Sequence, residues 1–133
     1  MPIGGFPVQF PAEVFTPLRY AILHHTDIPV PHFDLAFETK PGSTLITWRS
    51  PTWPIANPTP LERLADHRRE YLDYQGPVSN NRGQVHRIVG GTFQFESADE
   101  NYFQIKTDTG LHLSIRCRKG AIWLAEVNAV SCG

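Results

Sequence analysis

Prolines and glycines interrupt this chain so often that they restrict it to short structural segments. The sequence holds 12 prolines and 10 glycines in 133 residues. Because proline ends helices and both residues favour turns, these breaks exclude long helices over most of the chain. The segments between the breaks are rich in β-branched and aromatic residues, which favour strands. The sequence therefore predicts a mainly all-β protein.

Eight of these segments have the composition of strands. In residues 91–96, for example, Phe93 and Phe95 alternate with polar residues, which places one face of the strand in a core. Eight strands in one small domain predict a compact, closed or nearly closed antiparallel β-barrel, because closure removes unpaired sheet edges. The predicted strands are residues 17–24, 32–38, 43–49, 84–89, 91–96, 101–107, 111–117 and 121–128.

One segment, residues 59–72, has the signals of a short helix. Thr59 suits the N-cap, Pro60 the first helical position and Glu62 the capping box. The leucines and alanine of this segment form a helical stripe, although Arg68 falls within it. We therefore predict one short helix or helical turn in 59–72.

The size and charge of the chain limit its organisation and its partners. A chain of 133 residues predicts a single domain over 1–133, with residues 1–16 as an N-terminal arm. No apolar run approaches the roughly 20 residues that span a bilayer, and the N-terminus lacks a secretory signal. We therefore expect no membrane association and a cytoplasmic location. A net charge of -1 means that binding to nucleic acid would depend on a local arginine cluster.

The stretch "HHTDIPVPHFDLAF" concentrates residues that bind metals. His32 and Asp34 are two apart in a predicted strand, so their side chains share a face. A third ligand would come from His24 or His25, of which only one can reach that face. Imidazole and carboxylate suit zinc, manganese or iron, and three protein ligands leave positions for water and substrate. The alternative is a hydrogen-bonded surface pair without a metal.

A second pair of interest lies in the predicted helix. His67 and Tyr71 are four residues apart and would share one helical face. A histidine can bind phosphate or transfer a proton, and a tyrosine hydroxyl can hydrogen-bond a phosphate oxygen. On spacing alone, a solvated helix flank is the simpler interpretation. The chain has no Gly-rich phosphate loop and no nucleophile elbow.

The order of these segments resembles the 3′-phosphoesterase domain family of bacterial ligase D, an end-joining DNA ligase, and its stand-alone relatives. The resemblance covers about residues 18–128. It is carried by "RYAILHHTDIPVPHFDLAFE", "LITWRSP", "DHRREYLDYQG" and "FQIKTDTGLHLSIRCRKGAIWLAEV", which resemble the family's histidine and His-Tyr-Asp strands, Trp-x-x-Pro strand, Asp-His-Pro segment and closing hairpins.

This resemblance implies a β-barrel that trims 3′ ends of DNA or RNA-tipped DNA during end repair. The implied reactions are removal of a terminal ribonucleoside by a diesterase step and of the remaining phosphate by a monoesterase step. Manganese is the expected metal, with zinc as an alternative, and a separate DNA ligase or polymerase is the expected partner. The implied metal ligands are His24, His32 and Asp34, with His25 as the alternative to His24, and His67 and Tyr71 would contact the scissile phosphate.

Two positions depart from the family pattern. An arginine that follows the His-x-Asp motif in the family is Ala36 here, and a lysine after the Trp-x-x-Pro strand is Thr52. We expect Arg49, Arg82 or Arg87 to bind phosphate instead. These departures leave open a catalytically weakened module that binds DNA ends or acts as a scaffold for a separate ligase. A metal-dependent esterase acting on a small phosphorylated molecule is a third possibility.

Overall fold

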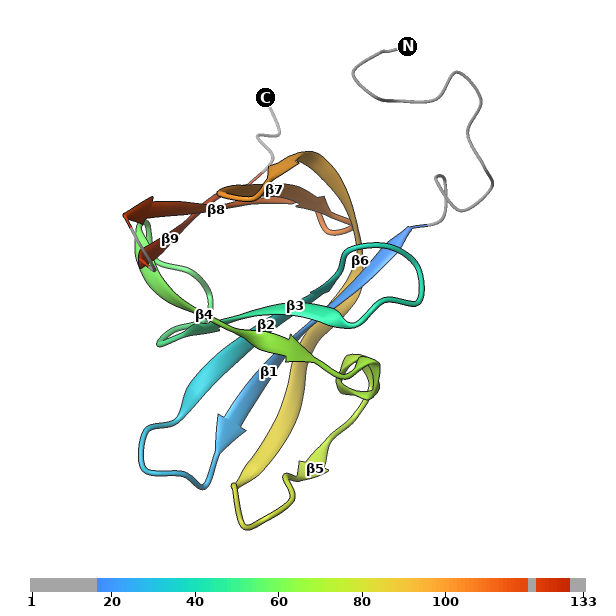
Figure 1. Cartoon of the computed structure of the whole chain (residues 1–133), viewed down its shortest axis with the longest axis vertical. Helices are drawn as coiled ribbons and strands as arrows, with labels where there is room; N and C mark the ends of the chain where they lie inside the picture. Colours follow the sequence, from blue (N-terminus) through green and yellow to red (C-terminus); the bar gives the residue numbers. More distant parts are fainter. Residues whose placement is uncertain (1–16, 120–121, 130–133) are drawn as a thin grey trace.

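The computed structural model describes residues 17–119 and 122–129, so the predicted N-terminal arm lies outside the described residues (Figure 1). Within these ranges the chain forms nine strands and one 3-10 turn. In chain order they are β1 (Leu18–Thr26), β2 (His32–Glu38), β3 (Leu45–Ser50), β4 (Thr59–His67), η2 (Arg69–Leu72), β5 (Gly76–Pro77), β6 (Gln84–Asp99), β7 (Tyr102–Thr107), β8 (Leu111–Lys119) and β9 (Ile122–Ala129).

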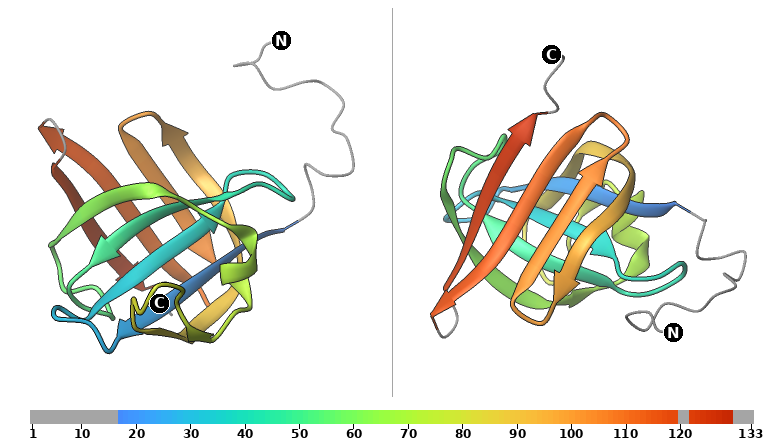
Figure 2. Two further views of the ribbon diagram at one scale, coloured as in Figure 1. Left: turned by 60° about the horizontal axis from the view of Figure 1, so that its bottom comes forward. Right: turned by 90° about the horizontal axis from the view of Figure 1, so that it is seen from above.

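The strands form one antiparallel sheet that curls into a nearly closed ring (Figure 2). Eight strands of the described chain follow one another round the ring in the order β1-β2-β3-β4-β9-β8-β7-β6, and β1 pairs with β6 to join its ends. Strand β5 pairs with β6 outside the ring. The predicted all-β barrel of about eight strands is therefore confirmed. The predicted strands 84–89 and 91–96 are parts of the single long strand β6.

The predicted helix over 59–72 is wrong for most of its length. Residues 59–67 form β4, and only the 3-10 turn η2 remains helical. At the start of β4, Thr59 and Leu61 are buried whereas Pro60 and Glu62 are exposed, which is the alternation of a strand. Pairing with β3 and β9 outweighs the local capping signals, because it is this pairing that continues the ring.

None of the helical segments in the described ranges combines the length and the apolar character that crossing a bilayer requires.

Strands β1, β2 and β3 are buried on both faces. One face contributes to the main core, which includes Ile22, Phe37 and Trp48. The other face carries a second apolar cluster, in which Leu23 and Ala36 pack against Leu72 of η2. This arrangement explains why Tyr20 through Leu23 are all buried in succession. It also places η2 over the outer face of the sheet, beside the site described below.

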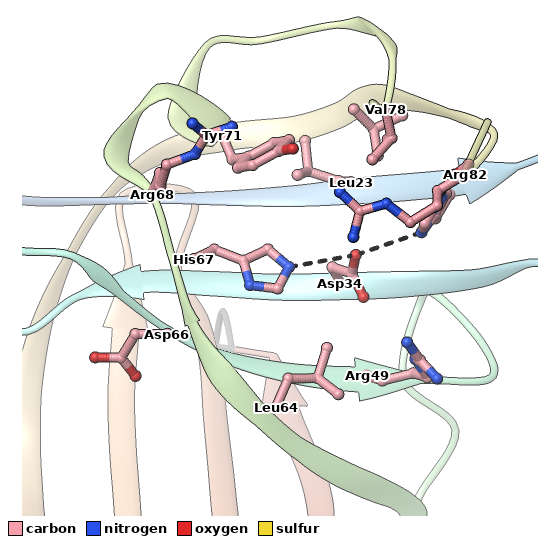
Figure 3. Close-up of a pocket in the computed structure, with 12 residues that line it drawn as sticks. Leu23, Asp34, Arg49, Leu64, Asp66, His67, Arg68, Tyr71, Val78 and Arg82 are labelled. Atoms are coloured by element: carbon pink, nitrogen blue, oxygen red, sulfur yellow. Dashed lines mark hydrogen bonds and ion pairs between the residues drawn. The ribbon is translucent and has the colours of Figure 1, made fainter. Parts of the chain in front are cut away.

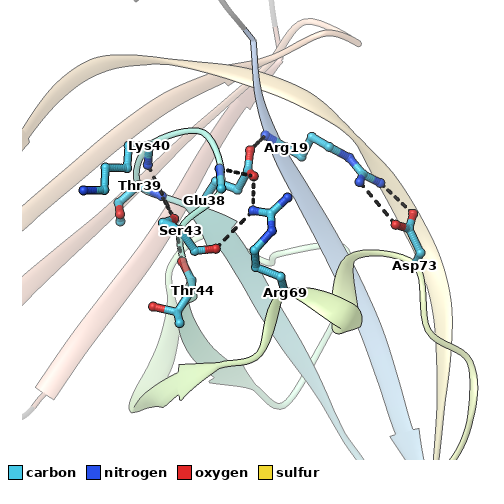
Figure 4. Close-up of polar contacts among 9 residues, drawn as sticks. Arg19, Glu38, Thr39, Lys40, Ser43, Thr44, Arg69 and Asp73 are labelled. Atoms are coloured by element: carbon cyan, nitrogen blue, oxygen red, sulfur yellow. Dashed lines mark hydrogen bonds and ion pairs between the residues drawn. The ribbon is translucent and has the colours of Figure 1, made fainter. Parts of the chain in front are cut away.

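A polar network holds η2 in that position (Figure 4). Buried Glu38 at the end of β2 accepts hydrogen bonds from the Arg69 guanidinium and from the backbone N–H groups of Arg19 and Gly42. The Arg19 guanidinium also forms an ion pair with Asp73, at 2.6 Å, just after η2. Burial opposes ionisation of Glu38, but the three hydrogen bonds outweigh it and lower the pKa of its carboxyl. The network therefore ties the turn to the ends of β1 and β2.

Candidate metal centre

The β1–β2 hairpin brings two histidines and one aspartate together. In its register His25 lies opposite His32, and Leu23 lies opposite Asp34, so the side chains of His25, His32 and Asp34 share the outer face. One potential ligand atom from each of the three residues lies within 4.8 Å of the others. A metal ion could be held by this group.

His24, the first choice for the third ligand, lies on the opposite face. It is paired with Phe33, and the two rings stack with centroids 4.4 Å apart. Because neighbouring residues of a strand point to opposite faces, His24 cannot join His32 and Asp34 while His25 does. The alternative residue, His25, occupies the predicted place.

Backbone hydrogen bonds fix which nitrogen of each histidine faces Asp34. His25 Nε2 lies 2.6 Å from the carbonyl oxygen of Arg82, and His32 Nδ1 lies 3.1 Å from that of Val30. Since a carbonyl only accepts, these nitrogens donate, which leaves His25 Nδ1 and His32 Nε2 with free lone pairs when the rings are neutral. These two atoms face the Asp34 carboxylate at 4.0 and 3.3 Å. Backbone partners of this kind are typical of metal-binding histidines.

The burial of the group is compatible with a bound cation. His32 and Asp34 are 5% and 4% exposed, and within the described residues His32 Nε2 and Asp34 Oδ1 have no hydrogen-bond partner. Leaving buried polar atoms unpartnered is costly, and a cation between them would satisfy both. Burial also lowers the pKa of His32, which favours the neutral form that binds metals. Two imidazoles and one carboxylate fit a zinc, manganese or iron ion.

His67 and Tyr71 lie beside this group, although the helix that was expected to carry them is absent. His67 ends β4, and its Nε2 lies 3.8 Å from Asp34 Oδ2 (Figure 3). Its Nδ1 lies 3.2 Å from the carbonyl of Ala65, so Nδ1 donates, and Nε2 carries the lone pair when the ring is neutral. Tyr71 of η2 packs against the His67 ring, with centroids 5.6 Å apart. Both residues therefore reach the same site.

His25, Asp34, His67 and Tyr71 line a pocket of about 390 Å³ on the outer face of the sheet, whereas His32 does not (Figure 3). Of the three arginines predicted to bind phosphate, Arg49 and Arg82 line this pocket. Arg87 is absent from its lining in the described chain, and its backbone N–H donates to Gln75. Arg68 also lines the pocket but was not predicted; its position next to His67 was the available signal. The full lining is Leu23, His25, Asp34, Arg49, Leu64, Asp66, His67, Arg68, Tyr71, Val78, Arg82 and Val85.

The side chain of Arg49 lies beside the group on the neighbouring strand. It lies opposite Asp34 in the pairing of β2 with β3, which puts the two side chains on the same face. Its contact with Glu62 is loose, at 3.7 Å between Arg49 Nη1 and Glu62 Oε1. Its Nε is buried, and no described residue accepts a hydrogen bond from it. Arg49 therefore retains donors for an anionic ligand.

The two departures from the family pattern have different surroundings. Ala36 is fully buried in the second apolar cluster, two residues after Asp34 on the same face. Thr52 is exposed in the loop after β3, and its carbonyl accepts a hydrogen bond from the Ser50 hydroxyl. Neither position contributes a cation to the pocket.

The arrangement combines a candidate cation site with arginines and a histidine that has an available lone pair. Such a combination suits binding and hydrolysis of phosphate esters. Comparisons of the chain with protein-family models and with curated proteins find no match.

Proposed function

We propose that the chain is a divalent-metal-dependent phosphoesterase that trims 3′ ends of DNA or RNA-tipped DNA in end repair. The observation that carries this proposal is the convergence of His25, His32 and Asp34, which include unpartnered buried atoms, beside a pocket that His25, Asp34 and Arg49 line. The residue order that resembles the ligase D family supports the choice of a 3′ phosphoester as substrate. Manganese is the proposed metal, with zinc as the alternative.

His25, His32 and Asp34 would hold the metal. A bound divalent cation supplies charge neutralisation at the phosphate and lowers the pKa of a bound water. Arg49 and Arg82 would bind the non-bridging phosphate oxygens, because guanidinium groups match phosphate geometry.

His67 and Tyr71 would act on the same phosphate. The lone pair on His67 Nε2 can accept a proton, and the protonated ring can then donate it to the leaving oxygen. The Tyr71 hydroxyl would donate a hydrogen bond to a phosphate oxygen. Partnership with a separate ligase or polymerase and a cytoplasmic location stay predictions.

The direct test uses DNA primers that end in a 3′ ribonucleotide or a 3′ phosphate. We expect manganese-dependent release of the nucleoside from the first primer and of inorganic phosphate from the second. His67→Ala should lower both rates strongly while the protein still binds manganese. Bound metal without turnover of either primer would refute the enzymatic proposal.

One observation favours the second candidate, a DNA-end-binding or scaffolding module without catalysis. Ala36 is buried in the second apolar cluster, so the family's phosphate-binding arginine has no counterpart at its own position. This candidate predicts salt-dependent binding to DNA ends that His67→Ala leaves unchanged, with no turnover. Turnover that His67→Ala abolishes would exclude it.

A further inference from the structure

A second pocket adjoins the candidate metal centre. It has a volume of about 340 Å³ and is lined by Val30, Pro31, His32, Arg49, Pro51, Pro60, Leu61 and Glu62. Arg49 lines this pocket and the first one, and His32 belongs to the metal-binding group. The two pockets therefore share Arg49 as a common wall, and each is lined by part of the candidate metal-binding group.

The walls of the second pocket are apolar and open to solvent. Val30 is 74% exposed, and the flanking prolines on three separate segments are also exposed. Proline has no backbone N–H and is held by its ring, so these segments offer firm apolar surfaces. Pockets of this size accommodate small organic groups. An exposed apolar wall beside a charged site indicates a ligand that has both an apolar part and a charged part.

The lining of the pocket also includes polar groups. The Glu62 side chain is 66% exposed, and its nearest cation, Arg49 Nη1, is 3.7 Å away. Its carboxylate can therefore accept hydrogen bonds from ribose hydroxyls or from an exocyclic amine. The planar guanidinium of Arg49 can meet a phosphate with its N–H edge. Together these groups match a nucleoside joined to a phosphate.

We propose that the second pocket binds the terminal nucleoside of a 3′ phosphodiester while the scissile phosphate lies at Arg49 beside His25, His32 and Asp34. This inference rests on the proposed function and specifies its substrate. Water adds to phosphorus, and the bond from phosphorus to the 5′ oxygen of the nucleoside breaks. The oxygen takes up a proton, so the nucleoside leaves with a 5′ hydroxyl and the primer keeps a 3′ phosphate.

The diester and monoester reactions should differ in their need for the second pocket. In a 3′ phosphomonoester no nucleoside is attached to the terminal phosphate, so its hydrolysis does not need the second pocket. We expect Val30→Trp, which fills the pocket from an exposed position, to lower kcat/KM for the ribonucleotide-ended primer at least tenfold. Hydrolysis of the 3′ phosphate should change less than twofold, which also shows that the variant is folded.

Two further variants serve as comparisons. Glu62→Gln lies on β4 and should lower the diester reaction more than the monoester reaction, chiefly for a ribonucleotide compared with a deoxynucleotide. Ile88→Trp, at a residue that is 44% exposed on β6 and belongs to neither pocket, should change neither reaction. Equal losses of both reactions in Val30→Trp and Glu62→Gln would overturn the assignment.

A binding measurement tests the pocket independently of catalysis. In a two-dimensional amide NMR titration, adenosine should shift the signals of Val30 and Glu62, whereas inorganic phosphate should shift those of Arg82 and Asp66. If neither primer is hydrolysed but adenosine gives this pattern, the proposed function fails and the nucleoside pocket stands. Adenosine shifts elsewhere, or none at all, would refute the pocket whatever the outcome for hydrolysis.

Discussion

Replacing Glu38 with glutamine tests whether the network around η2 holds the site together. In the described residues the Glu38 carboxylate accepts hydrogen bonds from Arg69, from Arg19 N at 2.7 Å and from Gly42 N at 3.3 Å, and its side chain is 4% exposed. A hydrogen bond to a charged group contributes about 1.5–3 kcal/mol net. Glutamine keeps one carbonyl acceptor, but its amide N–H₂ faces donors.

The net loss is smaller than the sum of these contacts. The Arg69 side chain is 38% exposed, so solvent screens its charge, and glutamine costs less to bury than a carboxylate. We expect Glu38→Gln to lower the free energy of unfolding by about 2–3 kcal/mol at pH 7. At about 3–5 °C per kcal/mol for a domain of this size, Tm should fall by about 6–15 °C. Asp73→Asn removes an exposed partner and should cost less than about 1 kcal/mol.

The effect of Glu38→Gln should depend on pH in a defined direction. The pKa of Glu38 is lowered from its usual value of 4.5 in the folded protein, so its stabilisation is complete above that value. As pH falls below 4.5 and through the folded pKa, the carboxyl takes up a proton and the stabilisation is lost. Glutamine does not titrate, so the difference between the two proteins should shrink towards pH 3.

Urea denaturation of both proteins from pH 7 to pH 3 measures this difference. A variant as stable as the parent at pH 7 would show that the carboxylate contributes nothing net. A difference that stays constant with pH would show that the loss comes from packing and not from charge. Either result would refute the role assigned to Glu38.

Three further substitutions test the candidate metal centre. His25→Ala should weaken manganese binding, measured by calorimetry, by more than about 100-fold, because even residues that only support a ligand contribute about 10–100-fold to metal affinity. The neighbouring His24→Ala should leave manganese binding unchanged. Asp34→Asn should likewise weaken manganese binding, but Asp66→Asn, in the same pocket, should not; equal effects would contradict the assignment of Asp34. Arg49→Ala should lower kcat/KM on the 3′ phosphate about 10–100-fold with normal manganese affinity. A change in manganese affinity instead would show that Arg49 holds the metal ligands in place.

The barrel could be predicted because its strands are marked in two independent ways. Turn residues divide the chain into segments, and alternating residues such as Phe93 and Phe95 show the strand period. The helix prediction for residues 59–72 was wrong because the helical signals in that segment are local, whereas β4 forms through pairing with β3 on one side and β9 on the other. Leu61 faces the main core and Leu64 lines the pocket on the other face. Leu61 and Leu64, three residues apart, would share one face of a helix. In the strand they lie on opposite faces.

The choice between His24 and His25 shows where sequence reasoning about the site ends. That His32 and Asp34 share a face follows from strand parity alone. Which histidine joins them depends on the register of the hairpin, in which His25 lies opposite His32. Moving that register by one residue would exchange His25 for His24. The sequence of the connecting loop does not fix this register, so only the paired strands show which histidine lies beside His32.

Ala36 links the packing of the protein to its proposed chemistry. An arginine at this fully buried position would place a charge among Ala21, Leu45 and Leu72, at a cost of several kcal/mol unless it were paired. Arg49 instead lies on the neighbouring strand, directly opposite Asp34, where its side chain is 42% exposed. A cation is therefore supplied across the strand pair without opening the apolar cluster. The alanine at position 36 thus does not by itself argue against phosphate binding, because the register of β2 with β3 places Arg49 beside Asp34.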